Sequence, residues 1–220
     1  MSDLQSRFEA FIASKDFPCV GAKAASARKT ITVIEGQDIT ASESDVRVHE
    51  GLHAFGRQLD HEAAFVQSCV VVYRGPCDLD EVGFENALWR RLQRLHELDR
   101  TAGHAWAKGV SDDPASPHFS MSLGGNAFFV VGLHPGASRP ARRFDHPTLV
   151  FNSHEQFERL RADGRFAKMQ KVIRERDRAL SGTINPMLAE FGRASEARQY
   201  SGRRLGPEWR CPFQPREQAR

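Results

Sequence analysis

The feature that most constrains the fold of this chain is a buried-strand pattern followed closely by a long amphipathic-helix pattern. Residues 64–75, "AFVQSCVVVYRG", form an apolar run rich in valine, bounded by Gly75 and Pro76, which is typical of a buried strand. Residues 78–103 then place valine and leucine on one helical stripe, which predicts an amphipathic helix. Because each apolar face must be covered by another element, this pair predicts layers of helices packed on a sheet.

The rest of the chain supplies further predicted elements. Helical spacing of apolar residues predicts helices over 3–14, 39–61, 155–164 and 166–180. Asn152 or Ser153 is the expected N-cap of the third of these. Runs of β-branched and aromatic residues predict strands over 29–36, 118–123, 126–134 and 148–152. We therefore expect an α+β fold, or a mixed-sheet α/β sandwich, with a central mostly antiparallel sheet and a single compact domain over residues 1–220.

Composition excludes several classes of protein. The formal net charge of +3 with 27% charged residues argues against a general nucleic-acid binder. No stretch approaches eighteen consecutive apolar residues and the N-terminus resembles no signal peptide, so we expect no membrane association and a cytoplasmic location.

The four cysteines are far apart in sequence, which favours reduced thiols. Fifteen Phe against two Tyr fit an ordinary core, and also the lining of a flat apolar cofactor.

The segment "HEGLH", residues 49–53, matches the H-E-x-x-H pattern. On a helix its two histidines lie on one face and can hold zinc, while the glutamate activates a water. The sequence does not supply the third ligand in the expected place, because Leu59 stands there and His61 lies two residues beyond. A carboxylate from the next predicted helix, Glu81 or Glu85, is available. A zinc metallohydrolase is thus one alternative, and an exposed, charged helix face is the other.

A histidine at the end of a predicted strand is followed closely by three arginines. His134 ends the strand pattern, Pro135 stops pairing there, and Arg139, Arg142 and Arg143 come within nine residues. Guanidinium groups bind carboxylates and phosphates bidentately. An imidazole, apolar walls and cations for two propionates are the groups that hold haem. On the residues alone, a satisfied histidine with arginines paired to acids on a neighbouring helix is the favoured explanation, and haem binding is the alternative.

Two cysteines lie beside proline and phenylalanine. Cys19 is part of "FPC", residues 17–19, and Cys211 begins "CPF", residues 211–213. Such a thiol is either an inert core group or a thiolate ligand for iron. We interpret Cys211 as inert and keep Cys19 as a candidate ligand.

Six segments, in order along nearly the whole chain, resemble the YqcI/YcgG family. They are "FPCVGAKAA" (17–25), "FENALWRRLQRLHELD" (84–99), "FFVVGLHPGASRPARRF" (128–144), "LVFNSHEQFERLR" (149–161), "IRERDRALSGTINPML" (173–188) and "SEARQYSGRRLGPEWRCPF" (195–213). The family includes the haem-dependent N-hydroxylases of guanitoxin and D-cycloserine biosynthesis. The resemblance therefore implies a haem b enzyme that activates oxygen or peroxide and hydroxylates a guanidine or amine nitrogen of a small arginine-like substrate.

The resemblance also implies roles for particular residues. His134 is the first candidate for the axial iron ligand, His154 the second and Cys19 the third. The propionate candidates are Arg139, Arg142 and Arg143. A guanidinium substrate needs an opposing carboxylate, for which we choose Glu196, with Tyr200 as a nearby hydrogen-bond donor; a salt bridge to a neighbouring arginine explains Glu196 equally well.

No flavin or nicotinamide motif is present, so reducing equivalents would come from an external reductase or from peroxide. We allow for a homodimer. A non-catalytic haem carrier or sensor is the third interpretation, beside the N-hydroxylase and the zinc metallohydrolase.

Overall fold

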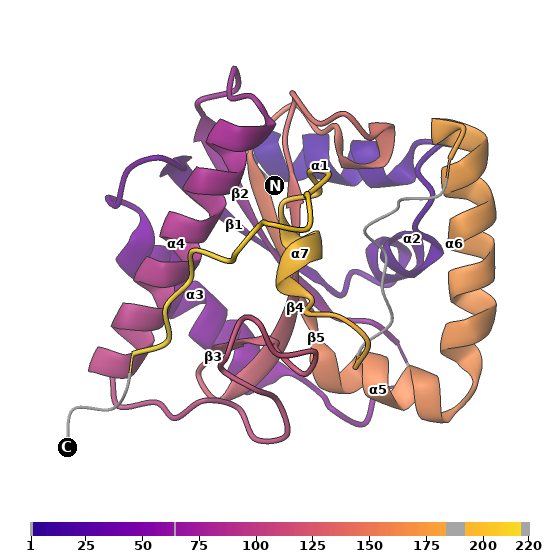
Figure 1. The fold of residues 1–220 in the computed structure, drawn as a ribbon. Helices are drawn as coiled ribbons and strands as arrows, with labels where there is room; N and C mark the ends of the chain where they lie inside the picture. The colour runs from indigo at the N-terminus through magenta and orange to yellow at the C-terminus, as the bar shows by residue number, and fades with distance from the viewer. Residues whose placement is uncertain (1, 64, 184–191, 217–220) are drawn as a thin grey trace.

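Five strands form one sheet, and helices cover both of its faces (Figure 1). A computed structural model describes residues 2–63, 65–183 and 192–216. The helices within these ranges are α1 Asp3–Ala13, α2 Val20–Ala27, α3 Asp45–Gln58, α4 Glu81–Thr101, the 3-10 turn η1 Pro140–Arg142, α5 His154–Ala162, α6 Arg165–Ser181 and α7 Ala197–Tyr200. The strands are β1 Ile31–Asp38, β2 Ser68–Gly75, β3 Met121–Leu123, β4 Asn126–Leu133 and β5 Thr148–Ser153.

The sheet is mixed and mostly antiparallel. Its strand order is β1-β2-β5-β4-β3. Only the β1 and β2 pair is parallel, with Val33 opposite Val70, and helix α3 makes the crossover that a parallel pair requires. The remaining pairs are antiparallel, and β3 and β4 join through a tight turn at Gly124 and Gly125. The predicted α+β fold is confirmed.

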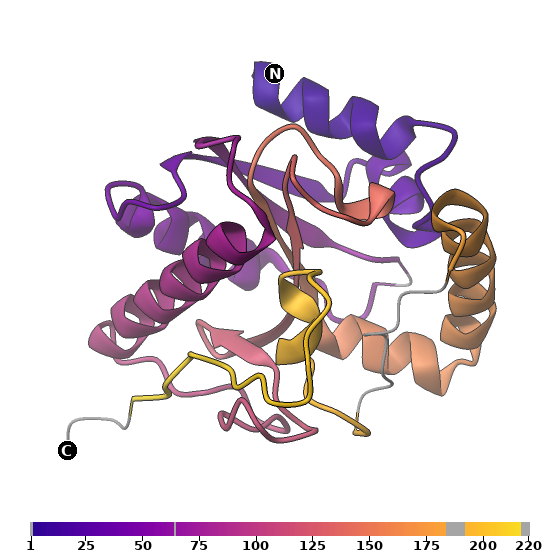
Figure 2. The same ribbon diagram turned by 45° about the horizontal axis from the view of Figure 1, so that its top comes forward.

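Successive residues of each strand face opposite sides of the sheet, as the pleat requires. On β2, Cys69, Val71 and Tyr73 belong to a core shared with helices α3 and α4. Val70 and Val72, between them, belong to a second cluster shared with α1. The two views in Figures 1 and 2 show α4 and α6 on opposite sides of the strands.

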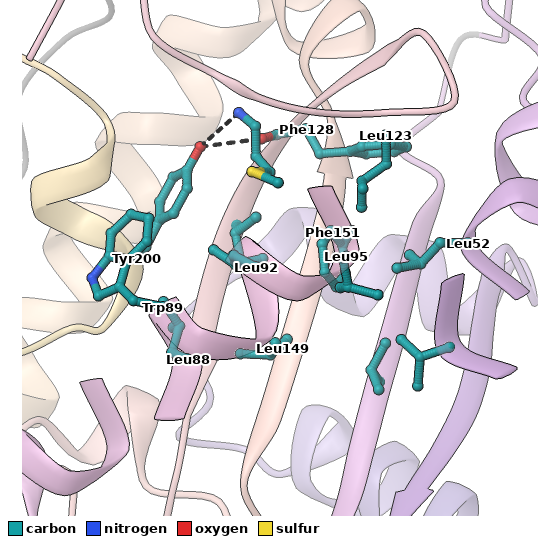
Figure 3. Packing of buried hydrophobic residues seen from close by; sticks show 14 of the residues in the cluster. Leu52, Leu88, Trp89, Leu92, Leu95, Leu123, Phe128, Leu149, Phe151 and Tyr200 are labelled. Atoms are coloured by element: carbon teal, nitrogen blue, oxygen red, sulfur yellow. Dashed lines mark hydrogen bonds between the residues drawn. The ribbon is translucent and has the colours of Figure 1, made fainter. Parts of the chain in front are cut away.

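The α3/α4 side holds the larger core. Leucines from both helices pack on the sheet, and Trp89 stacks on Tyr200 with ring centroids 5.6 Å apart (Figure 3). The other side is covered by α1, α2, α5 and α6. Its cluster is smaller, and a cavity opens between these helices and the sheet.

Several elements differ from the prediction or extend it. Residues 20–27, for which the sequence analysis predicts no helix or strand, form helix α2. The thiol of Cys19 caps this helix by accepting a hydrogen bond from Ala22 N. Ser153 is the residue that caps α5. Part of the family segment 173–188, from residue 184 on, lies outside the described residues. All four cysteines are free. Among the described helices, none has the length and apolar character needed to cross a membrane.

Candidate functional site

A cavity of about 330 Å³ lies between the sheet and helices α1, α2, α5 and α6, and we call it the pocket. Its volume is within the range of about 300–1,000 Å³ that is typical of small-molecule and cofactor sites. Most of its wall is apolar. The apolar lining residues include Phe8, Ile12, Phe17, Val70, Phe129, Val131, Val150, Phe157 and Phe166. The structure therefore has an apolar pocket lined by phenylalanines. That this pocket binds haem stays a prediction.

His154 lines the pocket because of its place after strand β5. Val150 and Asn152 of that strand point into the pocket, and His154 is the next residue on the same side of the alternation. Burial lowers the pKa of its imidazole, which favours the neutral form. Its Nδ1 atom is 3.9 Å from Glu196 Oε1, and its Nε2 atom is 3.7 Å from Glu158 Oε1. A neutral imidazole in this position has the protonation state that a metal ligand needs.

His134, the first candidate for the iron ligand, does not line the pocket. On strand β4, Phe129 and Val131 face the pocket, whereas Phe128 and Val130 belong to the α4 core. His134 follows the even-numbered set. It is only 1% exposed and stacks on Phe84 of α4, with ring centroids 4.3 Å apart and an interplanar angle of 14°. Its position is that of a core aromatic on the opposite side of the sheet.

Cys19, the third ligand candidate, does line the pocket. Its half-buried thiol lies at the N-terminus of α2. Burial raises the pKa of this thiol, although the N–H groups at the helix start act in the opposite direction. Without a metal, Cys19 is therefore a protonated thiol.

The three predicted propionate ligands have different surroundings. Arg139 lines the pocket, and its Nη2 atom lies 2.6 Å from Asp177 on α6. Arg142 also lines it but donates to three backbone carbonyls, and burial lowers its pKa to about 10. Arg143 does not line it and donates to the carbonyls of Ala137 and Ser138. Of these three arginines, Arg139 alone pairs with an acid on a neighbouring helix, as expected if the arginines have a structural role.

The sequence interpretation missed two further arginines of the pocket, Arg161 on α5 and Arg174 on α6. The signal was present as helical spacing, because α6 contributes residues of a single face to the lining. That face consists of Phe166, Met169, Gln170, Ile173, Arg174 and Asp177. Among the described residues, the Nε atoms of Arg139 and Arg174 are buried without a hydrogen-bond partner. Both arginines belong to the pocket wall, and within the described structure these two Nε–H groups have no acceptor.

Glu196 and Tyr200 lie next to each other but differ in access. Glu196 lines the pocket, is 4% exposed and accepts a hydrogen bond from Ser120 Oγ at 3.1 Å. Burial raises the pKa of its carboxyl group to about 7. Tyr200 does not line the pocket: its hydroxyl accepts from Met121 N and donates to Phe128 O, both at 3.2 Å (Figure 3). That hydroxyl therefore joins α7 to the β3–β4 pair.

The "HEGLH" histidines lie on one face of α3, as their spacing predicts. Both His49 and His53 reach Asp99 of α4, a residue that the sequence interpretation did not consider. The residues that it did consider lie elsewhere. His61 pairs with Glu155, Glu81 accepts from Ser138, and Glu85 pairs with Arg203. Glu50 is exposed.

The pocket fits a haem group by the chemistry of its wall. It offers one neutral imidazole, one thiol, aromatic walls and two arginine N–H groups without partners. His154 or Cys19 would hold the iron, and Arg139 and Arg174 would meet the propionates. Glu196 lies in the same wall as His154.

Comparisons with known proteins agree with the family resemblance. No curated protein and no solved structure matches the chain. The sequence profile of the YqcI/YcgG family matches residues 8–214. Because that match covers nearly the whole length, the chain belongs to the YqcI/YcgG family.

Proposed function

We propose that this protein binds haem b in the pocket and hydroxylates a nitrogen of a small guanidine or amine. The observation that carries the proposal is a buried imidazole, His154, in an apolar pocket whose wall also holds two arginine Nε atoms without partners. An iron porphyrin needs all three features: an axial donor, apolar faces and cations for its carboxylates. His154 replaces His134 as the first choice of ligand, because His134 lies across the sheet.

The bound haem would supply the activation of oxygen or peroxide. The chain itself would position the reactants. The phenylalanines of the pocket exclude water, and Arg139 and Arg174 fix the carboxylate edge of the ring through charge-assisted hydrogen bonds. The sequence contains no flavin or nicotinamide motif, so we propose that the electrons for oxygen activation come from an external reductase or that peroxide is the oxidant. We place this reaction in the cytoplasm.

Glu196 is the residue that we assign to the substrate. Burial raises the pKa of its carboxyl group to about 7. A guanidinium bound beside it would lower that pKa again, because a nearby positive charge stabilises the ionised carboxylate. In the complex, its oxygens would accept N–H bonds from the substrate and hold the nitrogen in place. Ser120, which donates to Glu196 Oε2, would keep the carboxylate oriented.

The direct test is an absorption spectrum of the purified protein with added haem. We expect a Soret band that is lost or shifted in His154→Ala and unchanged in His134→Ala. The variant Cys19→Ser tests the other ligand candidate. If the Soret band changes in Cys19→Ser and not in His154→Ala, the thiolate of Cys19 is the iron ligand. Wild-type protein without a Soret band overturns the proposal.

Catalysis needs a second measurement. Haem-loaded protein is incubated with arginine-like guanidines and amines, using peroxide or a reductase system, and N-hydroxylated product is measured by mass spectrometry. Product formation supports the oxygenase. Haem binding without product from any of these compounds supports a carrier or sensor instead.

A further inference from the structure

We infer that the protein has a second site, for one divalent metal ion of the zinc type, held by His49, His53 and Asp99. This site lies between helices α3 and α4, which cover the face of the sheet opposite the pocket. It is independent of the haem proposal, since it shares none of the pocket residues.

The three donor atoms converge on one point. His49 Nε2 is 3.1 Å from Asp99 Oδ1, and His53 Nε2 is 2.7 Å from the same oxygen. One ligand atom of each residue lies within 4.8 Å of the others. With zinc bonds of about 2.0–2.1 Å, the edge of a tetrahedron of ligands measures about 3.3–3.4 Å. To admit a metal, His49 Nε2 would move away from Asp99 Oδ1 by about 0.2–0.3 Å, and His53 Nε2 by about 0.6–0.7 Å.

The surrounding backbone holds the carboxylate in place. Gly124, in the β3–β4 turn, donates its N–H to both oxygens of Asp99, at 2.9 Å and 3.0 Å. Its φ of +58° lies in the left-handed region, which residues other than glycine rarely adopt. A Cβ atom at this position would also lie only 3.1 Å from the ring of His53. Outer contacts of this kind orient the ligands of metal sites.

A further imidazole lies beside these three residues. The ring of His104 lies 4.2 Å from that of His53 by centroid distance, and the ring of His49 lies 4.5 Å from that of His53. Asp99 lies in the last turn of α4, and His104 follows the end of that helix. The ring nitrogens of His104 are not part of the group of ligand atoms that lie within 4.8 Å of one another, so a water would fill the fourth position of a tetrahedral metal.

The role that this site supports is structural. The side chain of Asp99 is 3% exposed, and those of His49 and His53 are 11% and 13% exposed. Glu50, the residue that would activate water in the hydrolase pattern, is exposed on α3. The carboxylate of Glu50 is not in the group of ligand atoms gathered at this site, so it is not placed to activate a water bound in the fourth position. The metal would instead tie α3, the end of α4 and the β3–β4 turn together.

Metal content tests the inference. Protein stripped with EDTA is incubated with zinc chloride, passed over a desalting column and analysed for zinc. We expect about one zinc per wild-type chain, and none in His53→Ala or Asp99→Asn. His61→Ala is the matched control, because this histidine lies just beyond α3 and pairs with Glu155, and we expect it to keep its zinc.

Two readouts do not depend on the variants. Cobalt bound to the wild-type protein should give the intense visible bands of a tetrahedral N/O site. Zinc at about a hundred times its dissociation constant should raise the melting temperature by roughly 5–10 °C. Wild-type protein that retains no zinc and shows neither effect overturns the inference, and leaves a hydrogen-bonded carboxylate between two histidines.

The same samples separate this inference from the haem proposal. Asp99→Asn should lose zinc and keep the Soret band, whereas His154→Ala should do the reverse. Zinc that stays bound in both Asp99→Asn and His53→Ala would contradict the assigned ligands.

Discussion

His154 Nδ1 and Glu196 Oε1 lie 3.9 Å apart in the wall of the pocket, although the two residues belong to different elements. His154 directly follows strand β5, and Glu196 directly precedes helix α7. Burial lowers the pKa of the first and raises that of the second to about 7. Near neutral pH, the pocket therefore combines an uncharged imidazole with a carboxyl group that a cationic ligand can ionise.

Replacing the carboxyl group of Glu196 should separate substrate binding from haem binding. Glu196→Gln keeps the shape of the side chain and removes the charge that a guanidinium would meet. We expect the Soret band to remain and the rate of N-hydroxylation to fall by at least about tenfold, because a charged hydrogen bond contributes about 1.5–3 kcal/mol. Steady-state product formation at several substrate concentrations measures this, and an unchanged rate would return Glu196 to a structural role.

The arginines should divide into two groups in haem titrations. Arg174→Gln removes a guanidinium whose buried Nε has no partner in the described structure, and should weaken haem binding about tenfold. Arg143→Gln is the matched control, since Arg143 binds loop carbonyls away from the pocket and should not alter haem affinity. Equal effects of the two variants would contradict the assignment.

The strands and most helices were predictable from sequence because their signals are local. Helix α4 has its apolar residues at helical spacing, and β2 is a continuous apolar run. Helix α2 was missed because small residues carry little periodic signal, and its cap, Cys19, is an uncommon capping residue.

The face on which each candidate lies was also encoded in the sequence, but it required counting along the strands. Val131 and Val150 face the pocket, so His134 falls on the far side and His154 on the near side. The contact of Asp99 with His53 joins residues on two different helices. Spacing along one helix carries no information about such a partner, and only the packing of α3 against α4 reveals it.

Removing the hydroxyl of Tyr200 tests whether that residue is structural or catalytic. Tyr200→Phe removes the two hydrogen bonds that the buried hydroxyl makes with Met121 N and with Phe128 O. We expect the free energy of unfolding to fall by about 1–3 kcal/mol, measured by urea denaturation. The rate of product formation per folded, haem-loaded chain should not change, whereas a specific loss of that rate would make Tyr200 part of the catalytic site.

His134 should make the protein less stable in acid. Burial lowers the pKa of its imidazole, with Arg142 acting in the same direction and Glu81 in the opposite one. A histidine with a depressed pKa in the folded state stabilises the fold above its unfolded pKa of about 6.5, and this contribution is lost as the pH falls below that value. The free energy of unfolding should therefore decrease between pH 7.5 and 5.

The variant His134→Gln isolates this contribution, because glutamine keeps an N–H donor for the carbonyl of Leu79 and does not titrate. We expect a lower stability than wild type at pH 7.5, owing to the lost stacking on Phe84, but a smaller decrease towards pH 5. Urea denaturation of the haem-free proteins at both pH values measures the difference. A decrease as large as that of wild type would assign the acid sensitivity to His96 and His154, whose pKa values burial also lowers.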